Sequence, residues 1–313
     1  MVNRPHPWKV RIGVNPISWN NDDLPSLGAD IPLATALAEG AQIGYEGFEL
    51  GNKFPRSPQV LKALLASHGL ACVSGWYSGR LAQQGLDAEI RDGKAHMEML
   101  RAQGCSVVVY GEVADSIQGL RGVPLAKRPR LRHEASWQDY GKRLNAYGAH
   151  LKSAYGLTLA YHHHMGAYVE TAEDVDRLME VTDDNVGLLF DTGHCYLANA
   201  AAGADTDVVA LMKRHAPRIV HVHCKDVRPA IAAVARNEAW SFLDAVINGV
   251  FTVPGDGCID FHAVLAALRD VGYEGWLVVE AEQDPAVAPP YHYARLGYQT
   301  LSTLVGERHG DST

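Results

Sequence analysis

The sequence of 313 residues contains no long apolar segment, and no run approaches the roughly 18 consecutive apolar residues that a membrane-spanning helix requires. Its first ten residues, MVNRPHPWKV, lack the apolar centre of a secretory signal peptide. These two absences argue against membrane and secreted classes. They predict a soluble, cytoplasmic protein that has no membrane partner.

Cysteine is scarce as well, with five residues, and none of them forms a C-x-x-C pair. A disulfide framework normally uses an even set of cysteines, and a structural zinc site normally uses closely spaced cysteine pairs. We therefore expect reduced thiols, as in an intracellular enzyme.

Positive charge is in short supply, since 28 Lys and Arg face 36 Asp and Glu, for a net charge of -8. Proteins that bind nucleic acid normally present a basic face to the phosphates. The stretch AKRPRLRH, residues 126–133, is a basic cluster that we interpret as a solvated loop or an anion-contacting segment. The charge balance predicts that the protein has no nucleic-acid partner.

Short apolar runs, by contrast, recur along the whole chain, with helical patterns between them. The runs are apolar almost throughout, which is typical of parallel strands covered on both faces. The predicted strands are Val10–Val14, Gly47–Leu50, Leu70–Trp76, Cys105–Tyr110, Leu157–His162, Val186–Asp191, Arg218–His223 and Trp276–Glu280.

The helical patterns carry end signals. Pro32 and Pro58 stand at expected first-turn positions, where the missing N–H of proline costs nothing. Glycines that can adopt the left-handed C-terminal conformation follow several helical patterns: Gly44, Gly69, Gly104, Gly156 and Gly272.

Eight strands that alternate with helices over this length predict one α/β domain, a (β/α)8 barrel over residues 1–313. An open, doubly wound sheet is the alternative, but no G-x-G-x-x-G follows the first strand. The segments 111–136 and 227–256 are too long to be plain connections. Because both follow strands, we expect them to overhang the mouth at the C-terminal ends of the strands.

Metal-binding residue types stand at the ends of five predicted strands. Each one alone is more often a helix cap or a hydrogen-bonded buried histidine than a ligand. A barrel, however, brings these strand ends to one mouth, and alternation puts His162 and His164 on one face. A mixed nitrogen and oxygen set suits Mn²⁺, Co²⁺, Fe²⁺ or Zn²⁺ better than Ca²⁺ or Mg²⁺. The residues are Glu49, His162, His163, His164, Asp191, His221, His223 and Glu280.

Five stretches carry a family resemblance that runs from about Gly13 to the last helix. They are GVNPISWNNDDLPSLGADIPL, FELGNKFPR, AYHHHMG, FDTGHCYLA and HVHCKDVR. In these stretches the sequence resembles the inosose dehydratase family, within the xylose isomerase-like superfamily of sugar isomerases and epimerases. The first three stretches carry the specific part of the likeness, whereas DTGH and HVHCKD are common to the wider superfamily.

The resemblance implies a metal held by His162, Asp191, His223 and Glu280. The superfamily usually has a glutamate at the strand-five position, so the choice between His162 and His164 as the ligand stays open. Mn²⁺ or Co²⁺ is the expected ion, with Zn²⁺ and Fe²⁺ as alternatives, and a glutathione requirement is also associated with the family.

The implied reaction is a hydro-lyase step of myo-inositol catabolism: loss of water from 2-keto-myo-inositol (2-inosose), giving a trihydroxycyclohexane-1,2-dione. It needs a base for the proton next to the ketone and an acid for the departing hydroxyl. The candidates are Glu49, His164, His194 and Lys225, the lysine being expected to titrate near neutrality if desolvated beside a metal. A salt bridge is the alternative role for Lys225.

A small polyol ketone also requires fixed hydrogen-bonding groups, because a buried polar group left unpaired costs about 1–3 kcal/mol. The predicted substrate contacts are Asn15, Trp19, Asn52, Lys53 and Arg228. A metal-dependent isomerase or epimerase on the same barrel is the second interpretation. We also expect a homo-oligomer, with the helix at 289–307 as an interface.

Overall fold

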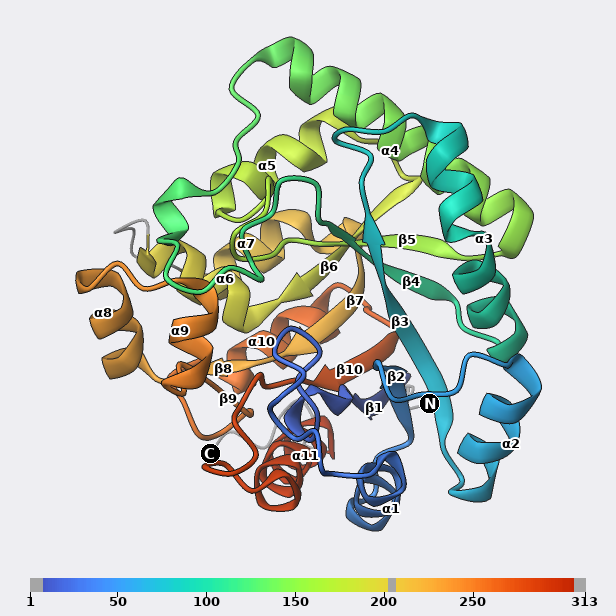
Figure 1. Ribbon diagram of the computed structural model, residues 1–313, viewed down its shortest axis with the longest axis vertical. Coiled ribbons are helices and arrows are strands. Elements are labelled where there is room, and N and C mark those ends of the chain that lie inside the picture. The colour runs from blue at the N-terminus through green and yellow to red at the C-terminus, as the bar shows by residue number, and fades with distance from the viewer. Residues whose placement is uncertain (1–7, 202–206, 307–313) are drawn as a thin grey trace, which may run out of the picture.

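A computed structural model describes residues 8–201 and 207–306, so the ends of the chain and Glu307 of the expected interface helix lie outside the described residues. Its core is a closed barrel of eight strands in the order β1-β10-β7-β6-β5-β4-β3-β2. Every neighbouring pair in the barrel is parallel. The predicted (β/α)8 barrel is confirmed (Figure 1).

The predicted strands match the barrel strands to within two or three residues at each end. The barrel strands are β1 Val10–Val14, β2 Gly47–Leu50, β3 Ala71–Gly79, β4 Val107–Glu112, β5 Thr158–His162, β6 Val186–Asp191, β7 Ile219–Cys224 and β10 Gly275–Val279.

Helices surround the barrel. They are α1 Leu33–Ile43, α2 Pro58–Ser67, α3 Leu86–Gln103, α4 Glu134–Tyr155, α5 Ala172–Val181, α6 Thr192–Ala201, α7 Val208–His215, α8 Pro229–Asn237, α9 Phe242–Ile247, α10 Phe261–Asp270 and α11 Pro290–Gly306, with short 3-10 turns η1 Pro16–Ser18, η2 Leu125–Lys127 and η3 Ala216–Arg218. Among residues 8–201 and 207–306, no helix is both long and apolar enough to cross a membrane.

The predicted helix ends are largely correct. Gly44, Gly104 and Gly156 are left-handed C-caps, with φ of 115°, 81° and 71°. A side chain in this conformation would crowd the backbone, which is why glycine stands there. Pro58 opens α2 as expected, whereas Pro32 lies one residue before α1, at its N-cap.

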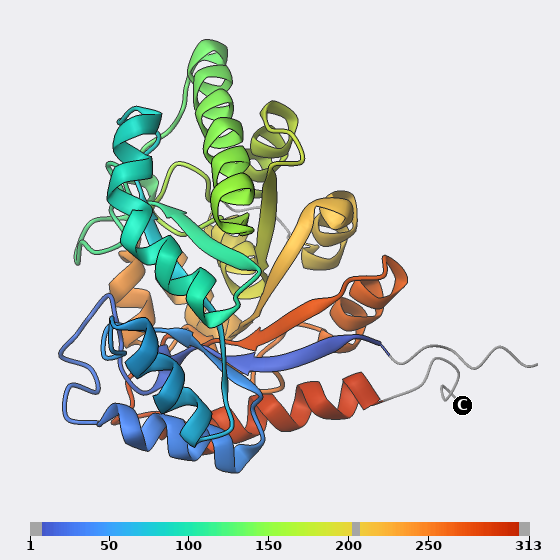
Figure 2. The same ribbon diagram turned by 90° about the vertical axis from the view of Figure 1, so that its right-hand side faces the viewer.

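Both long segments follow the C-terminal ends of barrel strands, β4 and β7. The second contains α8, α9 and a two-stranded antiparallel ribbon of β8 Asp226–Val227 and β9 Phe251–Thr252. Its apolar residues pack with those of α6 in a cluster separate from the main core. In Figure 2 the strands point to the left, and the loop after β1 (blue), the segment after β4 (green) and the α8–α9 segment (orange) lie at that end.

The barrel interior is filled by a small apolar cluster of Val107, Val109, Ala160 and Leu189, against which Trp76 packs. Val109 and Trp76 also line a cavity at the mouth, so the top of this cluster forms part of the cavity wall. Polar side chains from the strand ends complete that wall.

Candidate metal centre and active site

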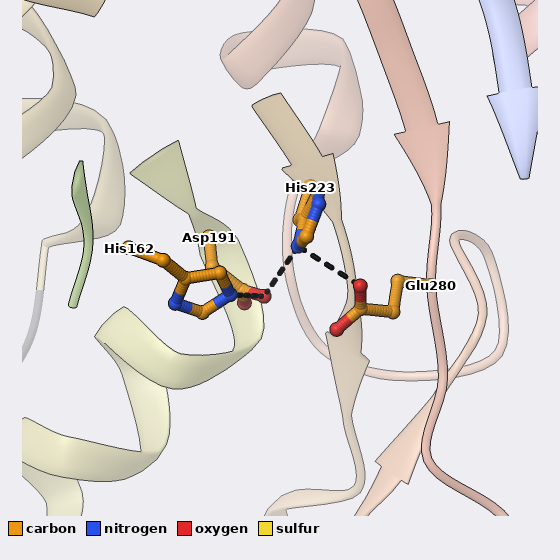
Figure 3. A group of neighbouring side chains, drawn as sticks. All are labelled: His162, Asp191, His223 and Glu280. Carbon is orange, nitrogen blue, oxygen red and sulfur yellow. Dashed lines mark ion pairs between the residues drawn. The ribbon is translucent and has the colours of Figure 1, made fainter. Parts of the chain in front are cut away.

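Four buried side chains meet at the mouth, one from the end of each of β5, β6, β7 and β10 (Figure 3). Asp191 Oδ2 lies 3.6 Å from His162 Nε2 and 3.5 Å from His223 Nδ1. His223 Nδ1 lies 2.9 Å from Glu280 Oε2. One ligand atom from each of the four residues lies within 4.8 Å of the others. The structure therefore brings together the four residues predicted as metal ligands.

The orientation of these groups fits a cation. Asp191 Oδ2 and His223 Nδ1 are buried and lie within ion-pair distance of neighbours, but neither makes a hydrogen bond of good geometry among the described residues. Buried polar atoms whose hydrogen bonds are left unsatisfied are costly and require an explanation. His162 Nδ1 lies 2.7 Å from the carbonyl oxygen of His163, which can only accept, so Nδ1 carries the proton and Nε2 keeps its lone pair. Two imidazoles and two carboxylates suit a divalent transition ion.

Asn15 and Glu49 contact two of the four candidate ligands, Glu280 and His223 respectively. Glu49 Oε1 accepts from Ser74 Oγ at 2.6 Å and lies 2.8 Å from His221 Nε2. Asn15 Nδ2 donates to Glu49 Oε2 and to Glu280 Oε2, both at 2.8 Å. Burial alone would raise the pKa of Glu49, but His223 and His221 hold it well below its usual range. Glu49 is therefore an ionised acceptor that orients two histidines.

Lys225 is fully buried beside the four ligands. Its Nζ lies 2.7 Å from Glu280 Oε1, 2.7 Å from Glu282 Oε2 and 3.3 Å from Asp191 Oδ2. Burial alone would lower the pKa of this lysine, but the three carboxylates raise it above its ordinary value. The expectation that Lys225 titrates near neutrality is therefore wrong, because ion pairing outweighs desolvation. The salt-bridge alternative is the one that the structure shows.

Local packing fixes the position of this lysine. Gly193 leaves room for its stem, since a Cβ there would come within 2.5 Å of Lys225 Cγ. Thr192 Oγ1 donates to the Lys225 carbonyl oxygen at 2.6 Å and accepts from its N–H at 3.0 Å. These contacts explain the threonine and glycine of the DTGH stretch.

A cavity of about 270 Å³ opens beside the four ligands. Of the residues predicted to bind or transform a substrate, Asn15, Glu49, Asn52 and His164 line it. Its wall also contains polar residues that the sequence analysis did not single out. These are Asp22, Asp23, Arg56, Ser78, Gln118 and Glu282.

His194 lies behind His164, with ring centroids 4.2 Å apart, and it is not part of the cavity wall. Its Nε2 lies 3.6 Å from Glu282 Oε1, and its ring packs on Phe242 and Phe251. The structure places His194 outside the cavity wall, and its catalytic role stays a prediction. From this position His194 can act through its contact with His164.

Three predicted substrate contacts point elsewhere. Trp19 is buried against Phe48 and donates through Nε1 to Glu39 Oε2 at 2.6 Å. Lys53 Nζ donates to the carbonyl oxygens of Gly28, Ala29 and Ile31. Arg228 pairs with Asp256 at 2.7 Å and lies against a different cavity. The sequence could not predict where these three side chains point, because side-chain direction within a loop follows no periodic pattern.

The fold agrees with the family to which the sequence is similar. The family model described as "Xylose isomerase-like TIM barrel" matches residues 37–301. The chain belongs to this family.

Relatives within the xylose isomerase-like family cover almost the whole chain. The rhizopine catabolism protein MocC of Rhizobium meliloti is 49% identical over 94% of this chain and 88% of its own length. The inosose dehydratase of Geobacillus thermodenitrificans is 43% identical over 95% of this chain and 98% of its own. The predicted resemblance is thereby confirmed.

A solved structure, the IolI protein with a bound zinc atom, superposes with a TM-score of 0.62. It is 19% identical and covers 94% of this chain and 96% of its own length. At that identity the likeness shows the fold alone.

Proposed function

We propose that this protein is a metal-dependent hydro-lyase that removes water from 2-inosose to give a trihydroxycyclohexane-1,2-dione. The observation that carries the proposal is the 41–43% identity, over more than nine-tenths of the chain, to inosose dehydratases of several bacteria. A polar cavity of about 270 Å³ next to a candidate metal centre supports it, since that volume suits a six-membered polyol ring.

In this proposal His162, Asp191, His223 and Glu280 hold the ion. Mn²⁺ or Co²⁺ is the proposed metal, with Zn²⁺ or Fe²⁺ as alternatives from the donor types. When bound, the ion supplies Lewis-acid polarisation of the ketone, which acidifies the neighbouring C–H. Family resemblance extends the proposal to a glutathione requirement, a cytoplasmic location and a homo-oligomer.

His164 is the proposed base. It lines the cavity, and its Nδ1 lies 2.9 Å from the carbonyl oxygen of Met165. The carbonyl can only accept, so Nδ1 carries the proton and Nε2 keeps a lone pair that can take the proton next to the ketone. Behind it, His194 fixes the ring of His164 by contact.

Asn15 and Asn52 are the proposed hydrogen-bonding residues for the ring hydroxyls. Asn15 is held by two carboxylates and by the N–H of Ile17, which its Oδ1 accepts at 3.0 Å. A side chain fixed in this way can reject a ring that presents the wrong hydroxyl. Lys225 holds Glu280 and Glu282 in place as a permanent cation.

The test uses metal-stripped protein and 2-inosose, with Mn²⁺, Co²⁺ or Zn²⁺ added in turn and dione formation followed by ultraviolet absorbance. We expect metal-dependent product that is lost in an Asp191→Ala variant. If the metal binds but no dione forms, the substrate assignment fails, and proton transfer without loss of water, as in an isomerase or epimerase, becomes the reaction to assay.

A further inference from the structure

The carboxyls that adjoin the candidate metal centre are each engaged by a neighbouring histidine or by Lys225. Glu49 and Glu280 are held ionised by His223, with Lys225 also acting on Glu280. Glu282 also lines the cavity, and burial raises its pKa to about 8, but its Oε2 is held by Lys225 Nζ at 2.7 Å. Hydroxide is a poor leaving group, so a dehydratase needs an acid within reach of the cavity.

Asp23 lines the same cavity from the loop between η1 and α1. It makes no ion pair with any residue that the structure describes in ranges 8–201 and 207–306. Its side chain hydrogen-bonds to Gln118, which comes from the segment after β4. Gln118 Oε1 is occupied by Ser116 Oγ at 3.0 Å, so its amide N–H is the group that donates to Asp23. This contact ties the side chain of Asp23 to the segment after β4.

The loop that carries Asp23 is built to hold one conformation. Asn21 Oδ1 accepts the N–H groups of Asp23 and Leu24 at 2.9 Å and 2.8 Å. Gly28, with φ of 73°, packs so close to the Trp19 carbonyl oxygen that a Cβ would lie 1.9 Å from it. Lys53 clamps the far end of the loop through three carbonyl oxygens. A catalytic group on such a loop is positioned before the substrate arrives.

We propose that Asp23 is the general acid that protonates the departing hydroxyl. The inference rests on the proposed dehydration. As the C–O bond breaks, its electron pair goes to oxygen, which takes the proton of Asp23 and leaves as water. The electron pair of the C–H bond that His164 has deprotonated becomes the new C=C bond of the enol form of the dione. The Asp23 carboxylate then regains a proton from solvent, and His164 returns one to solvent.

The surroundings of Asp23 favour the protonated form that this role requires. Burial raises the pKa of Asp23, and the charge of Glu280 adds to the increase, whereas Gln118, Lys225 and His162 act in the opposite direction with a smaller total effect. Its neighbour Asp22 serves a different purpose, because both of its oxygens lie 3.2 Å from the N–H of Asn52. Both aspartates line the cavity, but Asp22 is engaged by the backbone of Asn52, whereas Asp23 contacts the side chain of Gln118.

The experiment compares wild type, Asp23→Asn and the control Asp30→Asn, an exposed residue of the same loop. Three rates are measured on the Co²⁺-loaded proteins: dione formation from 2-inosose, exchange of the proton next to the ketone in D₂O by NMR, and fluoride release from an analogue with fluorine in place of the departing hydroxyl. The Co²⁺ absorption spectrum reports whether the metal centre is intact.

We expect Asp23→Asn to slow dione formation by roughly 100-fold or more, the usual contribution of a general acid. Proton exchange, fluoride release and the Co²⁺ spectrum should stay near wild type, because fluoride leaves without protonation. Asp30→Asn should match wild type throughout.

Dione formation within about threefold of wild type would overturn the assignment of Asp23, as would an equal fall in all three rates, which marks a structural role. A wild type that forms no dione from 2-inosose rejects the proposed function itself, and the assignment of Asp23 with it.

Discussion

The ammonium of Lys225 lies 2.7 Å from Glu280 Oε1, so a fully buried cation stands beside a carboxylate that also faces the candidate metal position. Glu282 and Asp191 lie within 3.3 Å of the same ammonium. Burial raises the pKa of Glu282 to about 8, so Glu280 and Asp191 carry the negative charge here, and one lysine alone does not balance the two. A divalent ion bound next to Asp191 and Glu280 would complete the compensation, and this arrangement leads to the first prediction.

Replacing Lys225 with methionine should destabilise the metal-free protein by about 3–5 kcal/mol, since breaking one side of a buried ion pair leaves uncompensated charge. Urea unfolding in the presence of a chelator measures this loss. Saturating Mn²⁺ should recover part of it, because the ion takes over the charge of the lysine. The control is Lys62→Met, at an exposed position of α2. An equal loss in both variants would contradict the ion-pair explanation.

The second prediction concerns Asp191. Its Oδ1 accepts the N–H of His194 at 2.8 Å, and its Oδ2 faces His162 and His223 without a hydrogen bond among the described residues. Asp191→Asn can keep the first contact while losing the charged ligand atom. We expect Co²⁺ affinity to fall by at least roughly 100-fold, above the 10- to 100-fold effect of residues that only orient a ligand.

Titration of stripped protein with Co²⁺, followed by absorbance, measures the affinity of the Asp191→Asn variant. Glu274→Gln is the matched control, since Glu274 is exposed and pairs with Lys9 at 3.1 Å. Unchanged Co²⁺ binding in Asp191→Asn would remove this residue from the ligand set.

The third prediction tests how Gly193 positions Lys225. A Cβ at Gly193 would lie 2.5, 2.8 and 2.9 Å from the Cγ, Cδ and Cβ of Lys225, so Gly193→Ala must push the lysine stem away from its carboxylates. Overpacking of this kind costs about 1–3 kcal/mol. We expect that loss in urea unfolding together with a clear decrease in kcat. Gly306→Ala, where an added Cβ meets open space, should change neither.

Most of the barrel was predictable because its signals are local. Parallel strands read as short apolar runs, and the glycines at the helix ends stand at positions with positive φ. The four candidate ligands could be predicted for a related reason. Residues at the C-terminal ends of barrel strands share one mouth, so His162 and Glu280 approach each other although they lie far apart in the sequence.

The remaining parts of the site depend on how the loops fold and on the direction in which their side chains point. Glu282 had a signal that the sequence analysis passed over, since it stands two residues after Glu280 and both line the cavity. Asp23 had none, because its position depends on the turn made by Asn21 and on a contact with Gln118. Trp19 shows the converse, as its loop was located correctly but its ring turns into the core.

The last prediction concerns pH and a carboxyl outside the cavity wall. Glu112, at the end of β4, is buried, and burial raises its pKa to about 7 from 4.5, while the N–H groups of Ala114 and Ala82 and the hydroxyls of Tyr110 and Tyr140 oppose the rise. An acid whose pKa is higher in the folded state destabilises that state when it ionises. Its penalty is absent below about pH 4.5, grows as the pH rises, and is complete above about pH 7.

Glu112→Gln removes this ionisation but leaves a side chain of similar size. Compared with the variant, wild type should therefore lose roughly 3 kcal/mol of unfolding free energy between pH 4.5 and pH 8, at about 1.4 kcal/mol for each unit of pKa difference. Urea unfolding of both proteins across that range measures the difference, and the shared titration of the buried histidines cancels. The exposed Glu274→Gln variant should follow wild type at every pH. A difference between wild type and Glu112→Gln that stays constant with pH would show that the pKa of Glu112 is not raised in the folded protein.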